Sequence, residues 1–143
     1  MSAEKQELAR RLSVAIGRVN RQIRPTGEGL SVGLVSALLT VMAHDGIRAG
    51  DLARIEKVAP PSMTRVVADL EARGLVEREA DPADGRASLI RITPLGIKAI
   101  EVARDSRADQ LLALVEAAED VEVAQLRDAV HLFEGLLRIA DSV

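Results

Sequence analysis

Apolar residues recur at intervals of three and four along the N-terminal part of the chain. In residues 4–24 they form one stripe, and arginines that include Arg18 and Arg21 lie opposite it, which predicts an amphipathic helix. The next run, which Ser31 is suited to cap, is apolar almost throughout and ends before Gly46. We expect this second helix to be the most deeply buried of the chain.

Two shorter helices are predicted next. Residues 49–56 fit one helical segment, with Leu52 and Ile55 on the side that faces the core. Residues 60–73 begin with two prolines, which lack a backbone N–H and therefore fit only the first turn of a helix. The apolar face of this helix is formed by Met63, Val66, Val67 and Leu70.

The pattern then changes to that of a hairpin. Residues 75–79 and 87–92 predict two short strands, joined by the tip "DPADGR" at residues 81–86. Within the tip, Asp84-Gly85 favours a tight turn because glycine tolerates positive φ.

Two longer helices complete the chain. The first is capped by Thr93, starts with a proline and extends toward residue 118, and the second covers about residues 121–140. Two helices joined by a turn and followed by a hairpin define a winged helix-turn-helix, here flanked by long helices. We therefore predict a mainly α fold with a small β-hairpin wing, in which residues 1–143 form a single domain and residues 31–96 form the winged helix-turn-helix lobe.

The composition excludes several kinds of site. The chain has no cysteine, so disulfides, thiolate metal sites and thiol redox chemistry are excluded. Its two histidines, His44 and His131, are too few for a metal cluster, and we expect no cofactor. No apolar run is long enough to cross a bilayer, and the first ten residues lack the apolar segment of an export signal. We expect a cytoplasmic protein with no membrane contact.

The charge of the chain does not itself indicate a nucleic-acid partner. With 19 basic and 22 acidic residues the net charge is −3. Any prediction of nucleic-acid binding therefore depends on where the charges lie in the sequence. Residues 48–91 carry eight basic and eight acidic side chains, whereas residues 92–143 carry five and ten. The acidic excess therefore belongs to the C-terminal helices.

The helix that starts with the two prolines carries candidate DNA contacts. In a helix-turn-helix the N-terminal residues of the second helix meet base edges in the major groove. Arg65 is placed to donate two hydrogen bonds to guanine, and the hydroxyls of Ser62 and Thr64 suit phosphates or bases. A solvent-facing helix with incidental polar residues remains the alternative for this segment taken alone.

The hairpin tip carries a further candidate. An exposed guanidinium such as that of Arg86 fits a narrow A·T-rich minor groove, where the potential is most negative. Asp84 is expected to pair with Arg86 and to fix its orientation. An ordinary solvated turn is the alternative.

These motifs resemble a known family. The stretch "LARIEKVAPPSMTRVVADLEARGLVEREADPADGRASLIRITPLG", residues 52–96, resembles the MarR family of winged helix-turn-helix regulators, and the flanking helices match over the whole chain. The resemblance implies a dimer that binds pseudo-palindromic promoter DNA, usually as a repressor released by a small molecule. Carried over by position, the implied DNA contacts are Pro61, Ser62, Thr64, Arg65, Asp84 and Arg86.

The same resemblance shapes three further expectations. Residues 4–24 and 93–141 would be dimerisation helices, because their apolar surface exceeds what one lobe needs. Family members often bind aromatic anions, yet the only aromatic residue here is Phe133, so the effector stays unknown, with Arg18 and Arg21 as candidate partners for a carboxylate. Where such proteins often have a serine, this chain has Ala59, which weakens the helix start by about 1 kcal/mol unless packing compensates.

The sequence bears on three classes of function. The leading one is a transcriptional regulator that binds double-stranded DNA. The second is a winged-helix adaptor that binds proteins only and has no need of Arg65 and Arg86. An enzyme is excluded, because the chain has no recognisable nucleophile with a neighbouring base and no phosphate-binding loop.

Overall fold

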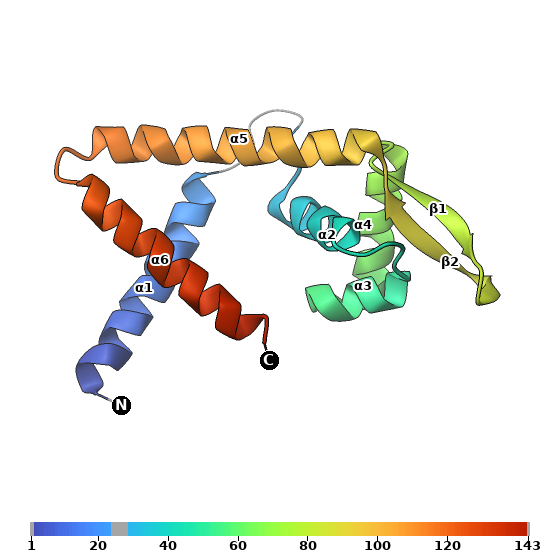
Figure 1. The fold of residues 1–143 in the computed structure, drawn as a ribbon, viewed down its shortest axis with the longest axis horizontal. Coiled ribbons are helices and arrows are strands. Elements are labelled where there is room, and N and C mark those ends of the chain that lie inside the picture. Colours follow the sequence, from blue (N-terminus) through green and yellow to red (C-terminus); the bar gives the residue numbers. More distant parts are fainter. Residues whose placement is uncertain (1, 24–28, 143) are drawn as a thin grey trace. The chain divides into compact units, whose positions relative to one another are not determined.

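The computed structural model describes residues 2–23 and 29–142. It contains two compact units, residues 1–108 and 109–143, and α5 contributes to both of them. Part of the loop expected after the first helix, residues 24–28, lies outside the described residues. The elements in Figure 1 are α1 (Ala3–Gln22), α2 (Val32–Met42), α3 (Ala49–Glu56), α4 (Pro60–Ala72), β1 (Val76–Asp81), β2 (Asp84–Ile92), α5 (Pro94–Ala117) and α6 (Val123–Ala140).

The predicted helix starts are confirmed by their capping bonds. The Ser31 hydroxyl accepts a bond from the Leu34 amide at 3.3 Å, and Thr93 does the same for the Gly96 amide at 3.1 Å. Each bond satisfies one of the amides that a helix start leaves without an intrahelical partner. The predicted single domain remains a prediction.

A small aliphatic core holds the first unit together. It is shared by α2, α3, α4, both strands and the start of α5, and its largest fully buried members include Leu38, Leu52, Met63 and Ile90. The prediction that α2 is the most buried helix is confirmed by four buried residues, more than any other described helix has. The inward placement of Ile55 was wrong, because this residue is 42% exposed and Ala53 is buried beside Leu52 instead.

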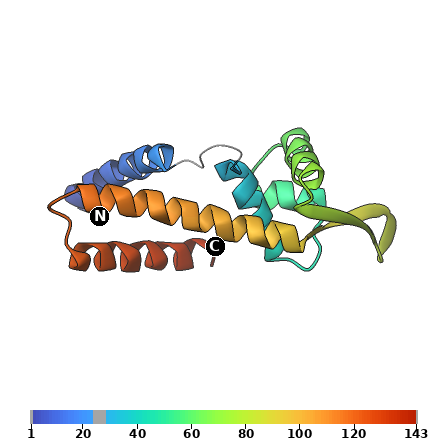
Figure 2. The same ribbon diagram turned by 90° about the horizontal axis from the view of Figure 1, so that it is seen from above.

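The two strands form an antiparallel hairpin, which we call the wing. Its register pairs Val76 with Ile92 and continues regularly to Ala80 opposite Ser88. The wing projects beyond α2, α3 and α4 in both views (Figures 1 and 2). At its root, backbone hydrogen bonds of 3.1 and 2.8 Å join Ile47 to Ile90. The connection between α2 and α3 thus pairs with β2 through an isolated antiparallel β-bridge.

The described part of α6, in the second unit, has no buried residue within the single chain. Its apolar side chains are nevertheless large, and Leu137 and Ile139 are 60% and 64% exposed. Among the described helices, none is long and apolar enough to cross a membrane.

We predict that Gly96→Ala destabilises the protein by about 2–3 kcal/mol, because the new methyl group overpacks the core. A Cβ at Gly96 would overlap the Leu75 carbonyl oxygen and lie 2.7 Å from Ile92 Cγ1. Denaturant unfolding at fixed protein concentration measures the change.

Gly33→Ala is the matched control. A Cβ there meets no atom within 4 Å, and alanine in a helix gains about 0.5–1 kcal/mol over glycine. Equal stabilities for the two variants would contradict the close approach at Gly96.

Candidate nucleic-acid interface

Helix α4 exposes the side chains that the sequence predicted to meet DNA. Met63, Val67 and Leu70 are buried, each with 2% exposure or less, so the opposite side of the helix faces solvent. The exposed residues at its start include the sequence candidates Pro61, Ser62, Thr64 and Arg65.

The start of α4 has no side-chain cap. Ala59 occupies the N-cap position, and the first helical bond runs from the Met63 amide to the Ala59 carbonyl at 3.0 Å. Because Pro60 and Pro61 have no N–H, two of the four amides that a helix start leaves without an intrahelical partner do not exist here. The Thr64 hydroxyl donates back to the Pro60 carbonyl at 3.0 Å, and the residue is exposed.

The connection from α3 to α4 is short, and hydrogen bonds from α2 hold the end of α3. Lys57, the single residue between 29 and 142 other than glycine with positive φ, ends α3 at φ 54°. One residue earlier, the Glu56 carboxylate accepts hydrogen bonds from Ser36 and Thr40 of α2, at 2.6 and 2.5 Å. These bonds fix the end of α3 against α2, and thereby fix the direction in which α4 starts.

The wing tip differs from the expectation in two respects. The turn is formed by Pro82 and Ala83, because Asp84, Gly85 and Arg86 already belong to β2. Gly85 does not have positive φ, so its predicted role in a left-handed turn was wrong.

The expected ion pair between Asp84 and Arg86 is corrected as well. The Asp84 carboxylate accepts the backbone amide of Arg86 at 3.0 Å, and the guanidinium of Arg86 has no ion pair among the described residues. Asp84 therefore shapes the backbone beside Arg86 rather than the direction of its side chain.

Sequence reasoning missed the ion pair that does organise the tip. Asp81 is the buried charged residue of the described chain, with 7% exposure, and its Oδ2 accepts bonds from Nε and Nη2 of Arg48 at 2.8 and 2.5 Å. Its Oδ1 accepts the Ala83 amide at 2.9 Å. The amide of Ala83 and, next, the Arg48 guanidinium hold the pKa of Asp81 below its usual value. The partners are 33 residues apart, so no local pattern relates them.

A second charged cluster lies at the wing root. Arg91 of β2 contacts Glu79 on β1 and Asp45 in the connection between α2 and α3. The hydrogen bond with Glu79 is the main reason that the pKa of Arg91 is raised. This cluster ties the root of the wing to the same connection that the Ile47 bridge holds.

Ion pairing separates the arginines of this region into two groups. Residues 48–91 contain seven arginines. Five of them form ion pairs with carboxylates: Arg48, Arg54, Arg73, Arg78 and Arg91. The two for which the structure has none are Arg65, on the exposed face of α4, and Arg86, in the wing.

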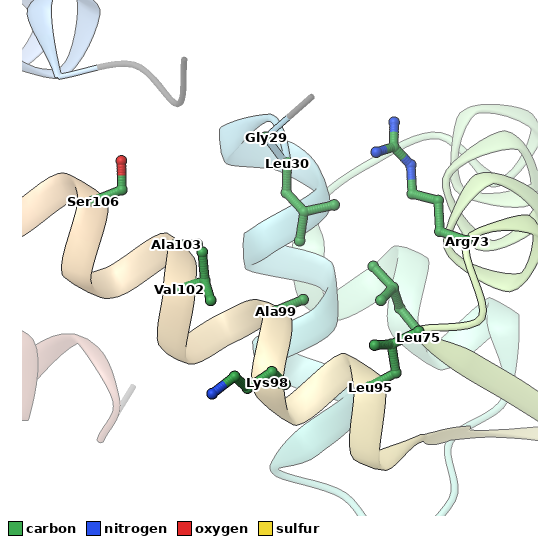
Figure 3. Close-up of a pocket in the computed structure, with 10 residues that line it drawn as sticks. All are labelled: Gly29, Leu30, Arg73, Leu75, Leu95, Lys98, Ala99, Val102, Ala103 and Ser106. Carbon is green, nitrogen blue, oxygen red and sulfur yellow. The ribbon is translucent and has the colours of Figure 1, made fainter. Parts of the chain in front are cut away.

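The first unit also has an apolar pocket with a volume of about 350 Å³. Figure 3 shows that Leu30, Leu75 and Val102 line it and that Arg73 and Lys98 add cationic side chains. No aromatic side chain is among its described lining residues. Neither Arg18 nor Arg21, the sequence candidates for an anionic effector, belongs to this lining; both are exposed on α1.

A helix-turn-helix with an exposed second helix, followed by a hairpin wing, defines the class of winged helix DNA-binding proteins. A family model of the MarR family matches residues 30–88. An HTH-type transcriptional regulator of Mycobacterium leprae is 36% identical over 132 residues, which are 91% of this chain and 92% of the relative. The chain belongs to the MarR family; it is a transcriptional regulator with a DNA-binding fold and not an enzyme.

Solved structures show the same fold. Apo MarR from E. coli has a TM-score of 0.75 at 19% identity, with coverage of 91% of this chain and 96% of that one. MepR, a regulator of the multidrug efflux pump MepA in Staphylococcus aureus, has a TM-score of 0.68 at 20% identity, with coverage of 96% and 99%. PcaV from Streptomyces coelicolor, solved with its natural ligand, has a TM-score of 0.61 at 22% identity, with coverage of 97% and 93%.

Proposed function

We propose that the protein is a dimeric repressor that binds pseudo-palindromic promoter DNA through α4 and the wing. The observation that carries the proposal is the selective pairing of arginines. An arginine held by a carboxylate must lose that partner before it contacts DNA, whereas Arg65 and Arg86 pay no such cost. In winged helix proteins bound to DNA, the second helix lies in the major groove and the wing reaches a minor groove, and Arg65 and Arg86 belong to these two elements.

The surroundings of Arg65 support a major-groove role. Pro61, Ser62 and Thr64 are exposed with it on the first turns of α4, where the partial positive charge of the helix start favours phosphate. A winged-helix adaptor that binds only proteins would not require Arg65 and Arg86 to be without carboxylate partners.

Dimerisation is supported by apolar surface that the single chain leaves uncovered. On α6, the side chains of Leu132, Leu136 and Leu137 are between 49% and 60% exposed. On α1, Leu8 and Val14 are 53% and 58% exposed. Apolar faces of this kind mark an interface, and a two-fold dimer sets two recognition helices about one DNA turn apart.

The apolar pocket supports release by a small anion. Its aliphatic lining suits an apolar body, and Lys98 supplies positive charge at its edge (Figure 3). The related fold of PcaV is known with a natural ligand. The effector would therefore contact this pocket. Arg18 lines a separate pocket of about 310 Å³ on α1, and Arg18 and Arg21 stay the second candidates.

We predict that Arg65→Ala weakens operator binding by about 1–3 kcal/mol and relaxes preference at one base position. Arg86→Ala should weaken binding with little change in base preference and lower the salt slope by about 1, because a groove contact without base bonds is mainly electrostatic. Titration against an operator selected from random DNA, at several salt concentrations, measures both.

Arg104→Ala, on the exposed side of α5, is the control for loss of one positive charge. If both Arg65→Ala and Arg86→Ala bind like this control, the DNA contacts are misassigned and the adaptor hypothesis gains support.

Light scattering at micromolar concentration should give about twice the 15.3 kDa of one chain. Leu137→Asp should lower this mass. The side chain is exposed in the single chain, so a carboxylate there leaves the fold of one chain intact but destabilises a dimer that buries it. Glu134→Ala, on the same helix, is the control and should remain dimeric. A wild-type mass near 15.3 kDa rules the dimer out.

Benzoate and hexanoate, an aromatic and an aliphatic carboxylate, test the pocket. At millimolar concentration at least one should lower operator affinity by about fivefold or more, as expected of allosteric coupling. Lys98→Met keeps the aliphatic stem but removes the charge, so it should reduce this effect, whereas Glu101→Gln on the same helix should not. The same release in Lys98→Met as in wild type would place the anion elsewhere.

A further inference from the structure

The wing needs a second support because its own strand pairing does not hold its tip. The regular register ends where Ala80 faces Ser88, and the next pair is Asp81 with Asp84. Residues 85–87 therefore have no partner on β1. A bulge of this kind bends the strand and interrupts the ladder, so the ladder alone leaves the direction of the Arg86 segment undetermined.

Asp81 supplies that support through both of its oxygens. Oδ1 accepts the amide of Ala83 in the turn, and Oδ2 accepts two bonds from the guanidinium of Arg48. One buried carboxylate thus joins the wing tip to a residue outside the wing. The two donors of Arg48 also restrict its rotation, which a single contact with a lysine would not do.

Arg48 is in turn fixed to the recognition helix. It is the N-cap residue of α3. Helix α3 packs on α4, and Leu52 of α3 and Met63 of α4 both belong to the shared core. The turn between these helices is short and ends α3 at Lys57. Any element bound to the start of α3 therefore keeps a fixed direction relative to α4.

We infer that Arg48 and Asp81 are positioning residues that set the wing at a fixed angle to α4, so that Arg65 and Arg86 engage DNA together. The inference rests on the proposed function, since it assumes that Arg86 contacts DNA. Arg48 and Asp81 then raise affinity without touching the operator, because they lower the entropy lost when the tip is immobilised.

The test is a double-mutant cycle on operator affinity. Asp81→Asn should weaken binding about tenfold when Arg86 is present and by less than about twofold in an Arg86→Ala background, since coupled residues are not additive. Asp81→Asn should also lower the salt slope toward that of Arg86→Ala, whereas a loss of stability alone leaves the slope unchanged. Arg48→Lys should reproduce Asp81→Asn because it keeps the charge and loses the two-point geometry.

Glu77→Gln is the matched control. It removes one carboxylate charge from β1, where the exposed Glu77 side chain has no ion pair among the described residues. It should leave affinity unchanged or slightly raised, because one repulsion from phosphate is lost. Thermal melts of every variant ensure that all titrations are made on folded protein.

Each other outcome of the cycle is informative. Equal losses from Asp81→Asn in both backgrounds overturn the inference while leaving the wing contact intact. A loss from Arg48→Lys that persists without Arg86 shows that Arg48 binds DNA itself, which also overturns it. No loss from Arg86→Ala contradicts the proposed wing contact and, with it, the inference.

Discussion

The burial of one face of α4 is the constraint on which the rest of the winged unit depends. Met63, Val67 and Leu70 enter the core and have almost no exposed surface. A helix has one rotation that buries these three positions, and that rotation turns Ser62 and Arg65 to solvent. Packing of the core and presentation of the DNA-binding face are thus a single event, and an aliphatic substitution inside the core that tilts α4 would also displace its arginine.

Elements specified by local rules could be predicted from the sequence. Every helix was placed to within about two residues, because apolar periodicity, the caps at Ser31 and Thr93 and the prolines that start α4 act over a few residues. The exposed face of α4 followed from the same periodicity. The sequence also predicted that Ala59, as N-cap, lowers the stability of the start of α4. The helix bounds then showed that Pro60 and Pro61 occupy the first two helical positions, so that two amides which would need a partner are absent.

Features that join distant parts of the chain could not be predicted. The strands proved longer than expected. The residues near the tip are polar and do not alternate, so the pattern gave no strand signal there, although Asp81 still pairs with Asp84 beyond the bulge. Asp84 and Arg86 are close in sequence, which favoured a pair, but Asp84 uses its carboxylate on a backbone amide. The ion pair of Arg48 with Asp81 and the contact of Arg91 with Asp45 span 33 and 46 residues, and only the folded core brings them together.

The charge of the molecule illustrates why composition is a poor guide to a DNA-binding surface. The net charge of −3 is repulsive toward phosphate at long range. At contact distance, however, the field depends on which guanidinium groups are already neutralised. Five carboxylates, those of Asp45, Asp69, Glu71, Glu79 and Asp81, pair with arginines that hold the wing and the helices in place, so these five acids do not oppose Arg65 and Arg86. A carboxylate and a guanidinium in contact largely cancel each other's field at a distance. The cations of residues 48–91 without an ion pair, Arg65, Arg86 and Lys57, therefore contribute most of the positive potential of this region.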